Sequence, residues 1–454
     1  MKRLLLGLTP LMMFASTIGF DQALQETFKN NNELKAKKLN IKLAKQDLAK
    51  AKSYDWGRLY ISEDISYTNN ALYVFGNKLE SREATFADFG LAEYNPMLGA
   101  AALAVQPDDL NNPDPRVNFK TKLVYEAPLF TGFKIKYAKE ISKLQIKAKT
   151  FKYQRDKNKL AIEVLKAYNG AVAAKYFIKA LESAKKTTTS FVNMTKDLYS
   201  QGMIVKSDIL NAESRDKDID AKMIEAKNKY NLALAYLRFL TGDNTITDVK
   251  DFKVIISPNS DLTSLQTKAL KNRNDVKWMQ KNVETMRKKV KMDDSIKYPT
   301  AGVHFEYGFN DNAVNNLSLK KDYYLLAANI TYNFIDAGKK QDLEKSKIQA
   351  EQTALYYKQM QNGIKVDVEQ KLSNLKTKTA IIDVKIQNKD LANAILEQYQ
   401  EMYKNGLINI SILLMKQAEA QKADAELIKA KYDQAIAAAE LQLAIGSSIL
   451  KESK

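Results

Sequence analysis

The side chains that most often carry out chemistry in proteins are nearly absent from this sequence. It has no cysteine and a single histidine, His304. A nucleophilic dyad needs a base beside the nucleophile, and a metal site needs three or four ligands together. His304 instead lies on the polar side of an alternating segment, with no second histidine to complete a site. The sequence therefore predicts no catalytic residue, no cofactor and no metal, so the protein is not expected to be an enzyme.

The most distinctive polar motif occurs twice, as a Tyr-x-x-Gly-x-x-x-x-Ser turn between helical segments. Its residues are Tyr199, Gly202, Ser207 and the following Asp208 in the first copy, and Tyr403, Gly406 and Ser411 in the second. Glycine commonly ends a helix in the left-handed conformation, and serine is a favoured N-cap. We expect each Gly to end one helix and each Ser to cap the next, with Asp208 at a positive helix terminus. Segments 199–208 and 403–411 are then the tips of two helical hairpins.

These tips belong to a tandem duplication of the chain. Moving the sequence by 204 residues aligns 199–242 with 403–446 without a gap; identical pairs include Ile204/Ile408, Leu210/Leu414, Leu237/Leu441 and Gly242/Gly446. Near the start of each half the offset becomes 242, which pairs Asn32-Glu33-Leu34-Lys35 with Asn274-Asp275-Val276-Lys277. The difference places about 38 extra residues in the first half, in a segment rich in Asn, Pro and Asp that reads as a long loop over 68–118.

Each half is expected to contain a helix, two strands, a long helix, a tip and a last helix. Segments 20–55 and 262–296 have helical periodicity. Segments 134–201 and 339–405 contain no proline, and at 1.5 Å per residue each would run about 100 Å. Apolar and polar residues alternate in four strands of about ten residues, a length that suits an outer-membrane strand. These strands are Leu59–Tyr67, Phe119–Leu129, Ala301–Phe309 and Tyr324–Phe334.

The helix after each tip has apolar residues at heptad spacing. In the first half these are Ile209, Ala212, Ile219, Met223, Ala226, Tyr230, Ala233, Leu237 and Leu240, with one polar interruption at Asp216. A strict seven-residue period predicts left-handed supercoiling against neighbouring helices. An ordinary antiparallel coiled coil would explain the helices equally well, but it would leave the alternating strands unexplained.

The N-terminus has the pattern of a secretory signal. Lys2 and Arg3 precede the apolar stretch Leu4–Phe14, and small residues follow to Gly19. Export with cleavage near Gly19 is therefore expected, the alternative being a short buried helix. The chain has 71 Lys and Arg against 53 Asp and Glu, a net charge of +18. We expect most of this charge on a solvated face, although cations that line a lumen would favour anionic cargo.

Four strands are too few to cross a membrane alone. Hydrocarbon tolerates no unpaired sheet edge, and closed barrels have at least eight strands. Several copies must therefore share one barrel. The expected organisation is a signal peptide (1–19), a first repeat (20–242), an equatorial linker (243–261), a second repeat (262–446, strand pair 299–334) and a tail (447–454). The fold class is mainly α with membrane β.

This combination of duplication, strand pairs, long helices and tips resembles the TolC-like outer membrane efflux protein family over essentially the whole mature chain. Asn31-Asn32-Glu33-Leu34, Pro128-Leu129-Phe130-Thr131-Gly132 and Phe334-Ile335-Asp336-Ala337-Gly338 also fit its pattern, except that the family usually has proline at the position of Asn32. The resemblance implies a homotrimer with a shared 12-stranded barrel in outer membrane lipid and a coiled-coil α-helical tunnel across the periplasm. It also implies a periplasmic adaptor and an inner-membrane pump of the RND or ABC type. The implied work is export of drugs, or of proteins by type I secretion.

The resemblance also locates a gate at the second tip. At the two positions where the best-known member has acidic residues this chain has Ile412 and Met415, and at the position of a gate-locking arginine it has Ile408. Asp208 and Tyr403 match their family counterparts and are expected to keep one hydrogen bond between helices. We expect an apolar constriction built by Ile412 and Met415, closed by packing and dewetting. The alternative is that both are ordinary coiled-coil core residues.

The sequence is compatible with two other classes of protein. A periplasmic adaptor would have a signal sequence and one long hairpin flanked by small β domains, whereas this chain has two hairpins and only 16 Gly and 8 Pro. A non-transport coiled coil, including a basic one that binds nucleic acid, would explain the charge but neither the signal nor the strands. No nucleic acid partner is therefore expected.

Overall fold

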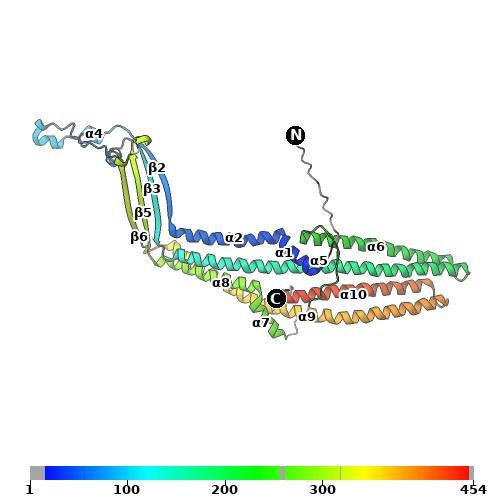
Figure 1. The fold of residues 1–454 in the computed structure, drawn as a ribbon. Helices are drawn as coiled ribbons and strands as arrows, with labels where there is room; N and C mark the ends of the chain where they lie inside the picture. The colour runs from blue at the N-terminus through cyan, green and yellow to red at the C-terminus, as the bar shows by residue number, and fades with distance from the viewer. Residues whose placement is uncertain (1–15, 256–260, 317, 449–454) are drawn as a thin grey trace, which may run out of the picture. The chain divides into compact units, whose positions relative to one another are not determined.

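The computed structural model describes residues 16–255, 261–316 and 318–448, which form two compact units. The first unit comprises Met1–Lys42, Ile146–Val283 and Ala354–Lys454, and the second comprises Leu43–Gln145 and Glu284–Thr353. The helices α5 (Lys134–Ser200) and α9 (Ala337–Lys404) contribute to both units (Figure 1). Most of the expected signal peptide, residues 1–15, and most of the expected tail, residues 449–454, lie outside the described residues.

Two antiparallel hairpins dominate the first unit. One pairs α5 with α6 (Lys206–Thr241), and the other pairs α9 with α10 (Ile410–Ala444). The proline-free segments do form single helices; the 67 residues of α5 give it a length of about 100 Å. None of the helices in the described part of the chain has an apolar stretch of the length that a bilayer crossing requires.

The two segments expected as single helices are each broken in the structure. Segment 20–55 divides into α1 (Phe20–Asn30) and α2 (Asn32–Ser53), and segment 262–296 into α7 (Leu262–Asn272) and α8 (Asn274–Asp293). Asn31 causes the first break, because its side-chain oxygen accepts a hydrogen bond of 2.9 Å from the Leu34 N–H and so caps a new helix. Asn32 is therefore a first helical position, where proline is well tolerated.

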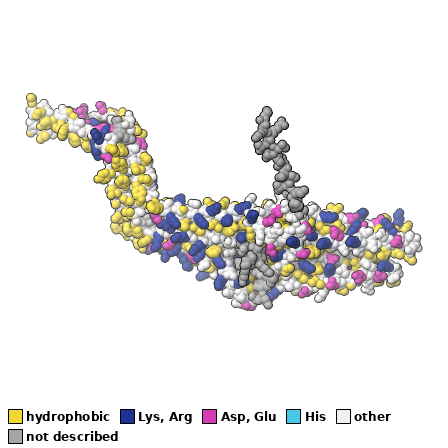
Figure 2. Space-filling view, in the orientation of Figure 1, with side chains coloured by type: hydrophobic (Ala, Val, Ile, Leu, Met, Phe, Trp, Pro, Cys, Tyr) yellow, Lys and Arg dark blue, Asp and Glu magenta, His cyan; other side chains and the backbone are white. Residues whose placement is uncertain are grey.

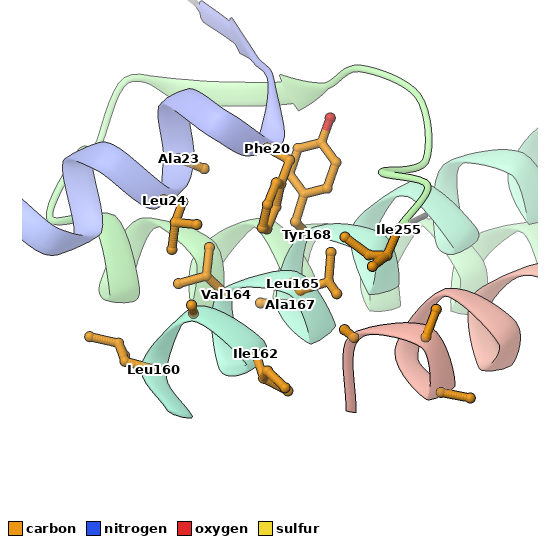
Figure 3. Packing of buried hydrophobic residues seen from close by; sticks show 14 of the residues in the cluster. Phe20, Ala23, Leu24, Leu160, Ile162, Val164, Leu165, Ala167, Tyr168 and Ile255 are labelled. Atoms are coloured by element: carbon orange, nitrogen blue, oxygen red, sulfur yellow. The ribbon is translucent and has the colours of Figure 1, made fainter. Parts of the chain in front are cut away.

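The core of the first unit joins both repeats. Phe20, Leu24, Val164, Leu165 and Tyr168 are buried there, and the rings of Phe20 and Tyr168 meet edge to face at 5.8 Å (Figure 3). Much of the predicted heptad stripe is buried as expected: Ala212, Ile219, Ala226, Leu237 and Leu240 in α6.

A small parallel sheet that was not predicted from the sequence adds to this core. β1 (Ser16–Ile18) pairs with β4 (Ile246–Val249). Ile18 is 1% exposed, and both ends of β4 are fully buried. β1 falls within the segment expected as signal peptide, and β4 within the expected linker.

The second unit is built on a four-stranded antiparallel sheet. Its strands are β2 (Arg58–Thr68), β3 (Arg116–Phe130), β5 (Thr300–Asp311) and β6 (Asp322–Thr331), in the order β2-β3-β5-β6. The predicted alternation is confirmed by the register, which aligns Ile61 with Leu123 and Leu123 with Tyr307 on an apolar face. Hydrophobic side chains gather over the strands in Figure 2. β6 ends three residues before Phe334, which is 89% exposed.

Short helical segments flank the strands of the second unit. They are η1 (Tyr54–Trp56) before β2, η4 (Asp294–Lys297) before β5, and η5 (Val314–Asn316) and η6 (Leu319–Lys321) between β5 and β6. The expected loop over 68–118 is also partly helical: it contains α3 (Ala71–Glu80), η2 (Ala87–Phe89), η3 (Pro96–Ala104) and α4 (Asp108–Asn111). α3 begins where Asn70 accepts a hydrogen bond of 3.1 Å from the Leu72 N–H, an N-cap that composition alone did not reveal.

Candidate functional site

The two tips have nearly the same backbone geometry. Gly202 has φ +73° and Gly406 has φ +69°, the left-handed conformation expected at a helix C-terminus. In the first tip the Met203 N–H donates to the Leu198 carbonyl at 2.9 Å, and the Gly202 N–H donates to the Tyr199 carbonyl at 2.9 Å. Residues 402–407 repeat this pair of bonds. Both bonds together define a Schellman motif, so each Gly ends its helix as predicted.

The predicted serine caps are wrong in both tips. α6 begins at Lys206 after the extended Val205, so Ser207 already lies inside the helix. α10 begins at Ile410, and its cap is Asn409, whose side-chain oxygen accepts from the Ile412 N–H at 3.1 Å. Val205 and Asn409 are the last extended residues before the two helices. Each lies two residues before the serine, so the helical backbone has already begun when the chain reaches Ser207 and Ser411. Asp208 remains in the first turn of α6, where its charge favours the helix N-terminus.

A small apolar cluster, here called the tip core, holds the ends of the two hairpins together. Its buried members are Phe191, Val192, Ala212, Tyr403, Ile410 and Leu413. Tyr403 is 3% exposed, and its hydroxyl has no hydrogen-bond partner in the described structure. The expected bond to Asp208 is therefore not formed. Burial, followed by the negative charge of Asp208, raises the pKa of Tyr403 to about 12. Tyr199, the matching tyrosine of the first tip, is 46% exposed.

The residues at the family's gate positions lie beside the tip core rather than within it. Ile408 packs against the cluster. Ile412 is half-buried and Met415 is 49% exposed, whereas the neighbouring Leu413 is fully buried. Ser411 is exposed. The structure thus places Ile412 and Met415 on a side of α10 that the rest of this chain leaves partly uncovered.

A partly buried arginine that was not predicted from the sequence joins the two hairpins near the tips. The Nε of Arg215 on α6 donates to Gln417 Oε1 at 3.0 Å, and its Nη2 donates to Gln421 Oε1 at 3.0 Å, both on α10. The Arg215 side chain is 14% exposed and Gln417 is 2% exposed. Burial lowers the pKa of Arg215. The sequence indicates only that an arginine lies beside the heptad stripe. Its partners are 202 and 206 residues away along the chain, so the contact could not be predicted.

The polar interruption of the heptad stripe is also explained. Asp216 accepts hydrogen bonds from Lys185 at 2.8 Å, Thr188 at 2.8 Å and Thr189 at 3.1 Å, all on α5. Burial opposes the charge, but these bonds and the Lys185 charge keep the pKa of Asp216 below its usual value. A fully satisfied polar group at a heptad core position fixes the register of α5 against α6.

The polar face of the four-stranded sheet is a connected network of charged side chains. Glu126 pairs with Arg58 at 2.7 Å, and Lys122 pairs with Asp64 at 2.8 Å. His304 lies on this face, as predicted, with Nδ1 3.3 Å from Glu126 Oε1 and Nε2 3.4 Å from a second carboxylate, Glu306. Such a face suits water rather than lipid.

On β2 the opposite face is apolar except for Glu63. It lies between Ile61 and Ile65 on β2, and its carboxylate accepts a hydrogen bond from Thr121 of β3. Ile61 is 74% exposed and Ile65 is 65% exposed. In the described chain β2 and β6 each pair on one side only, so the sheet has two open edges.

The fold is shared with outer membrane channels of known structure. The chain is similar to CusC (12% identity, TM-score 0.78, covering 96% of this chain and 94% of CusC). It is also similar to the Campylobacter jejuni channel CmeC (16%, 0.75, 94% and 85%) and to the Neisseria gonorrhoeae channel MtrE (13%, 0.75, 98% and 95%). No curated protein sequence matches the chain.

A family model for outer membrane efflux proteins matches residues 78–243 and 265–447, which is more than half of the chain. This match separates the protein from periplasmic adaptors and from non-transport coiled coils. Members of the family are outer membrane channels, not enzymes, and they work with adaptor and pump partners. From its repeats, its strands and this match, the chain belongs to the outer membrane efflux protein family.

Proposed function

We propose that the protein is the outer-membrane exit duct of an export system and that three copies form one channel. The observation that carries this proposal is the four-stranded sheet with an exposed apolar face and two open edges. Unpaired backbone groups in hydrocarbon cost several kcal/mol each. Pairing β6 of one copy with β2 of the next removes every edge when the ring closes. Three copies give 12 strands, above the minimum of eight for a membrane barrel.

The helices of such a trimer form a tunnel across the periplasm. The hairpins α5/α6 and α9/α10 carry apolar residues that the single chain leaves exposed, including Ile224, Leu232 and Phe239 on α6 and Val366 and Leu391 on α9. Neighbouring copies would cover these side chains. The lengths of α5 and α9, about 100 Å each, suit a duct that reaches far from the membrane.

The tips are where an adaptor protein and an inner-membrane pump would engage the duct. Met203 is 69% exposed, Val205 63% and Leu407 69%. Exposed apolar side chains at both tips support contact with another protein. The cargo is either small toxic molecules, with a drug-type pump of the RND class, or secreted proteins, with an ABC-type pump. The genes next to this one would distinguish the two.

Assembly and conduction test the proposed duct together. Protein extracted from outer membranes in detergent is expected to have the mass of a trimer by native mass spectrometry and to form pores in planar bilayers. Ile61→Arg puts a cation on the apolar face, which costs about 2 to 4 kcal/mol near the bilayer centre, so trimer yield should fall. Ser66→Arg, on the polar face of the same strand, is the control and should assemble. A monomer without pore activity would contradict the proposal.

We further propose that Ile412 and Met415 form an apolar constriction at the tip of the trimer. Apolar rings close narrow pores by dewetting. Replacing both residues by Ser should raise single-channel conductance, because water can then enter the constriction. Gln398→Ser, at an exposed polar position of α9, should leave conductance unchanged. Equal conductance for the double variant and the wild type would show that the constriction lies elsewhere.

A further inference from the structure

The helix α3 lies on the polar face of the sheet, at the end of the strands away from their helices. The side-chain amide of Asn310 on β5 donates to the Asn77 carbonyl of α3 at 3.2 Å. The Lys120 ammonium on β3 lies 3.3 Å from the Glu80 carboxylate of α3. Lys120 is the register partner of both Asn310 and Asp64, so these residues share the polar face. Since the strands join their helices at the opposite end, α3 sits where the β2–β3 and β5–β6 connections meet.

The segment after α3 is fastened to both connections by ionic and backbone contacts. Glu83 pairs with Arg116 at 2.7 Å and also with Lys321, whose second partner, Asp311, lies 2.7 Å away and is 2% exposed. Arg82 has a left-handed backbone (φ 55°) and donates to two carbonyls of the β5–β6 connection, at 2.8 and 2.6 Å. α3 is therefore held in place and is not a loosely attached loop.

The dimensions of a trimeric barrel leave little room for three such helices. Twelve strands spaced about 4.8 Å apart and tilted about 40° give a ring about 24 Å across. A helix with its side chains is about 10 Å thick. Three copies of α3 against the inner wall would each extend most of the way to the axis, which lies about 12 Å from the wall.

We propose that α3 forms the constriction at the external mouth of the duct, with Leu72, Tyr73 and Leu79 facing the passage. This inference rests on the proposed trimeric duct, in which the polar face lines the lumen. Leu72 is 75% exposed, Tyr73 62% and Leu79 48%, whereas Val74 on the side toward the sheet is 2% exposed. The exit is thus narrowed by apolar and aromatic side chains above a charged lumen, and their size sets the width available to cargo.

The absence of cysteine permits a direct test by single-site labelling. Tyr73→Cys trimers in planar bilayers are treated, from the side of the external loops, with a cationic, membrane-impermeant methanethiosulfonate reagent. The expected result is a stepwise loss of conductance that dithiothreitol reverses. Met97→Cys is the matched control, because Met97 is 94% exposed on η3 of the same connection, in a part that extends away from the strands in Figure 1. Labelling Met97→Cys should leave conductance unchanged.

The outcomes separate this inference from the function on which it rests. If untreated variants form no pores in any trial, and the wild type forms none, the proposed duct itself fails. If pores form and labelled Tyr73→Cys keeps its full conductance, α3 lies outside the passage and the inference is overturned. An equal loss in Met97→Cys would also overturn the assignment to α3. Leu72→Cys and Leu79→Cys repeat the test if Tyr73→Cys does not assemble.

Discussion

Glu63 is the one carboxylate that interrupts the apolar face of β2. Its neighbours on that face, Ile61 and Ile65, are exposed in the chain and suited to lipid. A hydrogen bond from Thr121 satisfies only part of the acceptor capacity of the carboxylate. Ionisable residues that face hydrocarbon are costly and rare. Glu63 is therefore expected to reduce the stability of the barrel.

Replacing Glu63 by Leu should stabilise the assembled protein by about 1 kcal/mol, since acidic residues on a lipid face cost less than the 2 to 4 kcal/mol of basic ones. Asp64→Leu is the control, and its expected effect on stability has the opposite sign. It acts on the polar face, where it removes the 2.8 Å pair with Lys122, and it should lower stability. Denaturant titration of the protein in lipid vesicles measures both effects. Destabilisation by Glu63→Leu would indicate that its bond to Thr121 outweighs the burial cost.

The cluster around Arg273 links three helices of the second repeat through one partly buried cation. The guanidinium makes a bidentate contact with Asp275, at 3.0 and 2.8 Å, and donates to Asp367 at 2.7 Å and to the Ala444 carbonyl at 3.2 Å. Burial alone would raise the pKa of Asp275, but hydrogen bonds and the charge of Arg273 outweigh it and hold the pKa below its usual value. Asp275 is thus more acidic in the folded state than in the unfolded state.

This shift predicts the pH dependence of the first unit. A lowered folded-state pKa contributes stability above the unfolded value of about 3.9, and that contribution disappears as the pH falls through the folded value. Asp275→Asn should lose about 2 kcal/mol at neutral pH, because it removes the bidentate partner of the partly buried Arg273 guanidinium. Its stability should also depend less on pH below about 4. Thermal unfolding followed by circular dichroism from pH 7 to pH 3 measures both. Parallel curves for variant and wild type would contradict the shift.

At the scale of elements, a ladder of ion pairs aligns α9 with α10. Three lysines at seven-residue intervals on α9 pair with acids at the same interval on α10. The pairs are Lys371–Glu440 at 2.8 Å, Lys378–Asp433 at 3.1 Å and Lys385–Glu426 at 2.7 Å, and Lys389–Asp424 follows at 3.3 Å. In each of these pairs the lysine lies on α9 and the acid on α10. If α9 shifted by seven residues relative to α10, some of these pairs would form and others would be lost.

A charge swap tests whether the ladder contributes to stability. Lys378→Glu places like charges together and should destabilise the hairpin, whereas Lys378→Glu with Asp433→Lys restores an opposite-charge pair. The coupling expected for one partly exposed pair is about 0.5 kcal/mol and should shrink at high salt. Chemical denaturation of the four members of the cycle at low and high salt gives this value. A coupling near zero at low salt would mean that apolar packing alone sets the alignment.

The elements that the sequence predicts well are those whose pattern repeats over many residues. The four strands, the two long helices and both tip glycines follow from alternation, absence of proline and the position of Gly202 and Gly406. Local side-chain geometry was harder to predict: the break at Asn31, the start of α3 at Asn70 and the cap at Asn409 depend on one amide each. Arg215 could not be paired with Gln417 because nothing local in the sequence brings α6 beside α10.

At the scale of the whole molecule, β1 places the first described residues in the core. Ile18 is 1% exposed, and cleavage near Gly19 would remove it. We therefore expect the mature chain to keep Ser16–Ile18, so that the boundary of the signal peptide lies before Ser16. Mass spectrometry of the purified protein identifies the N-terminus. A mature chain that begins after Ile18 would contradict this prediction.

The contribution of β1 can be measured with two neighbouring substitutions. Ile18→Ala should cost about 3 kcal/mol, because it removes a buried branched side chain and leaves a cavity. Thr17→Ala, at an exposed position of the same strand, should have little effect. Thermal unfolding of the two variants gives the difference. Equal stability would mean that the pairing of β1 with β4 is weak in solution.

The pairing of β1 with β4 also sets an order of events during secretion. Ser16 bonds to Thr245, a separation of 229 residues. A chain that crosses the inner membrane from its N-terminus exposes β1 first and cannot pair it until the whole first repeat has followed. Contacts this distant in sequence form late, because a long loop must close before they are gained. The leading segment therefore travels unpaired, with its apolar residues open to chaperones or to aggregation, and the first unit is completed only after translocation of most of the chain.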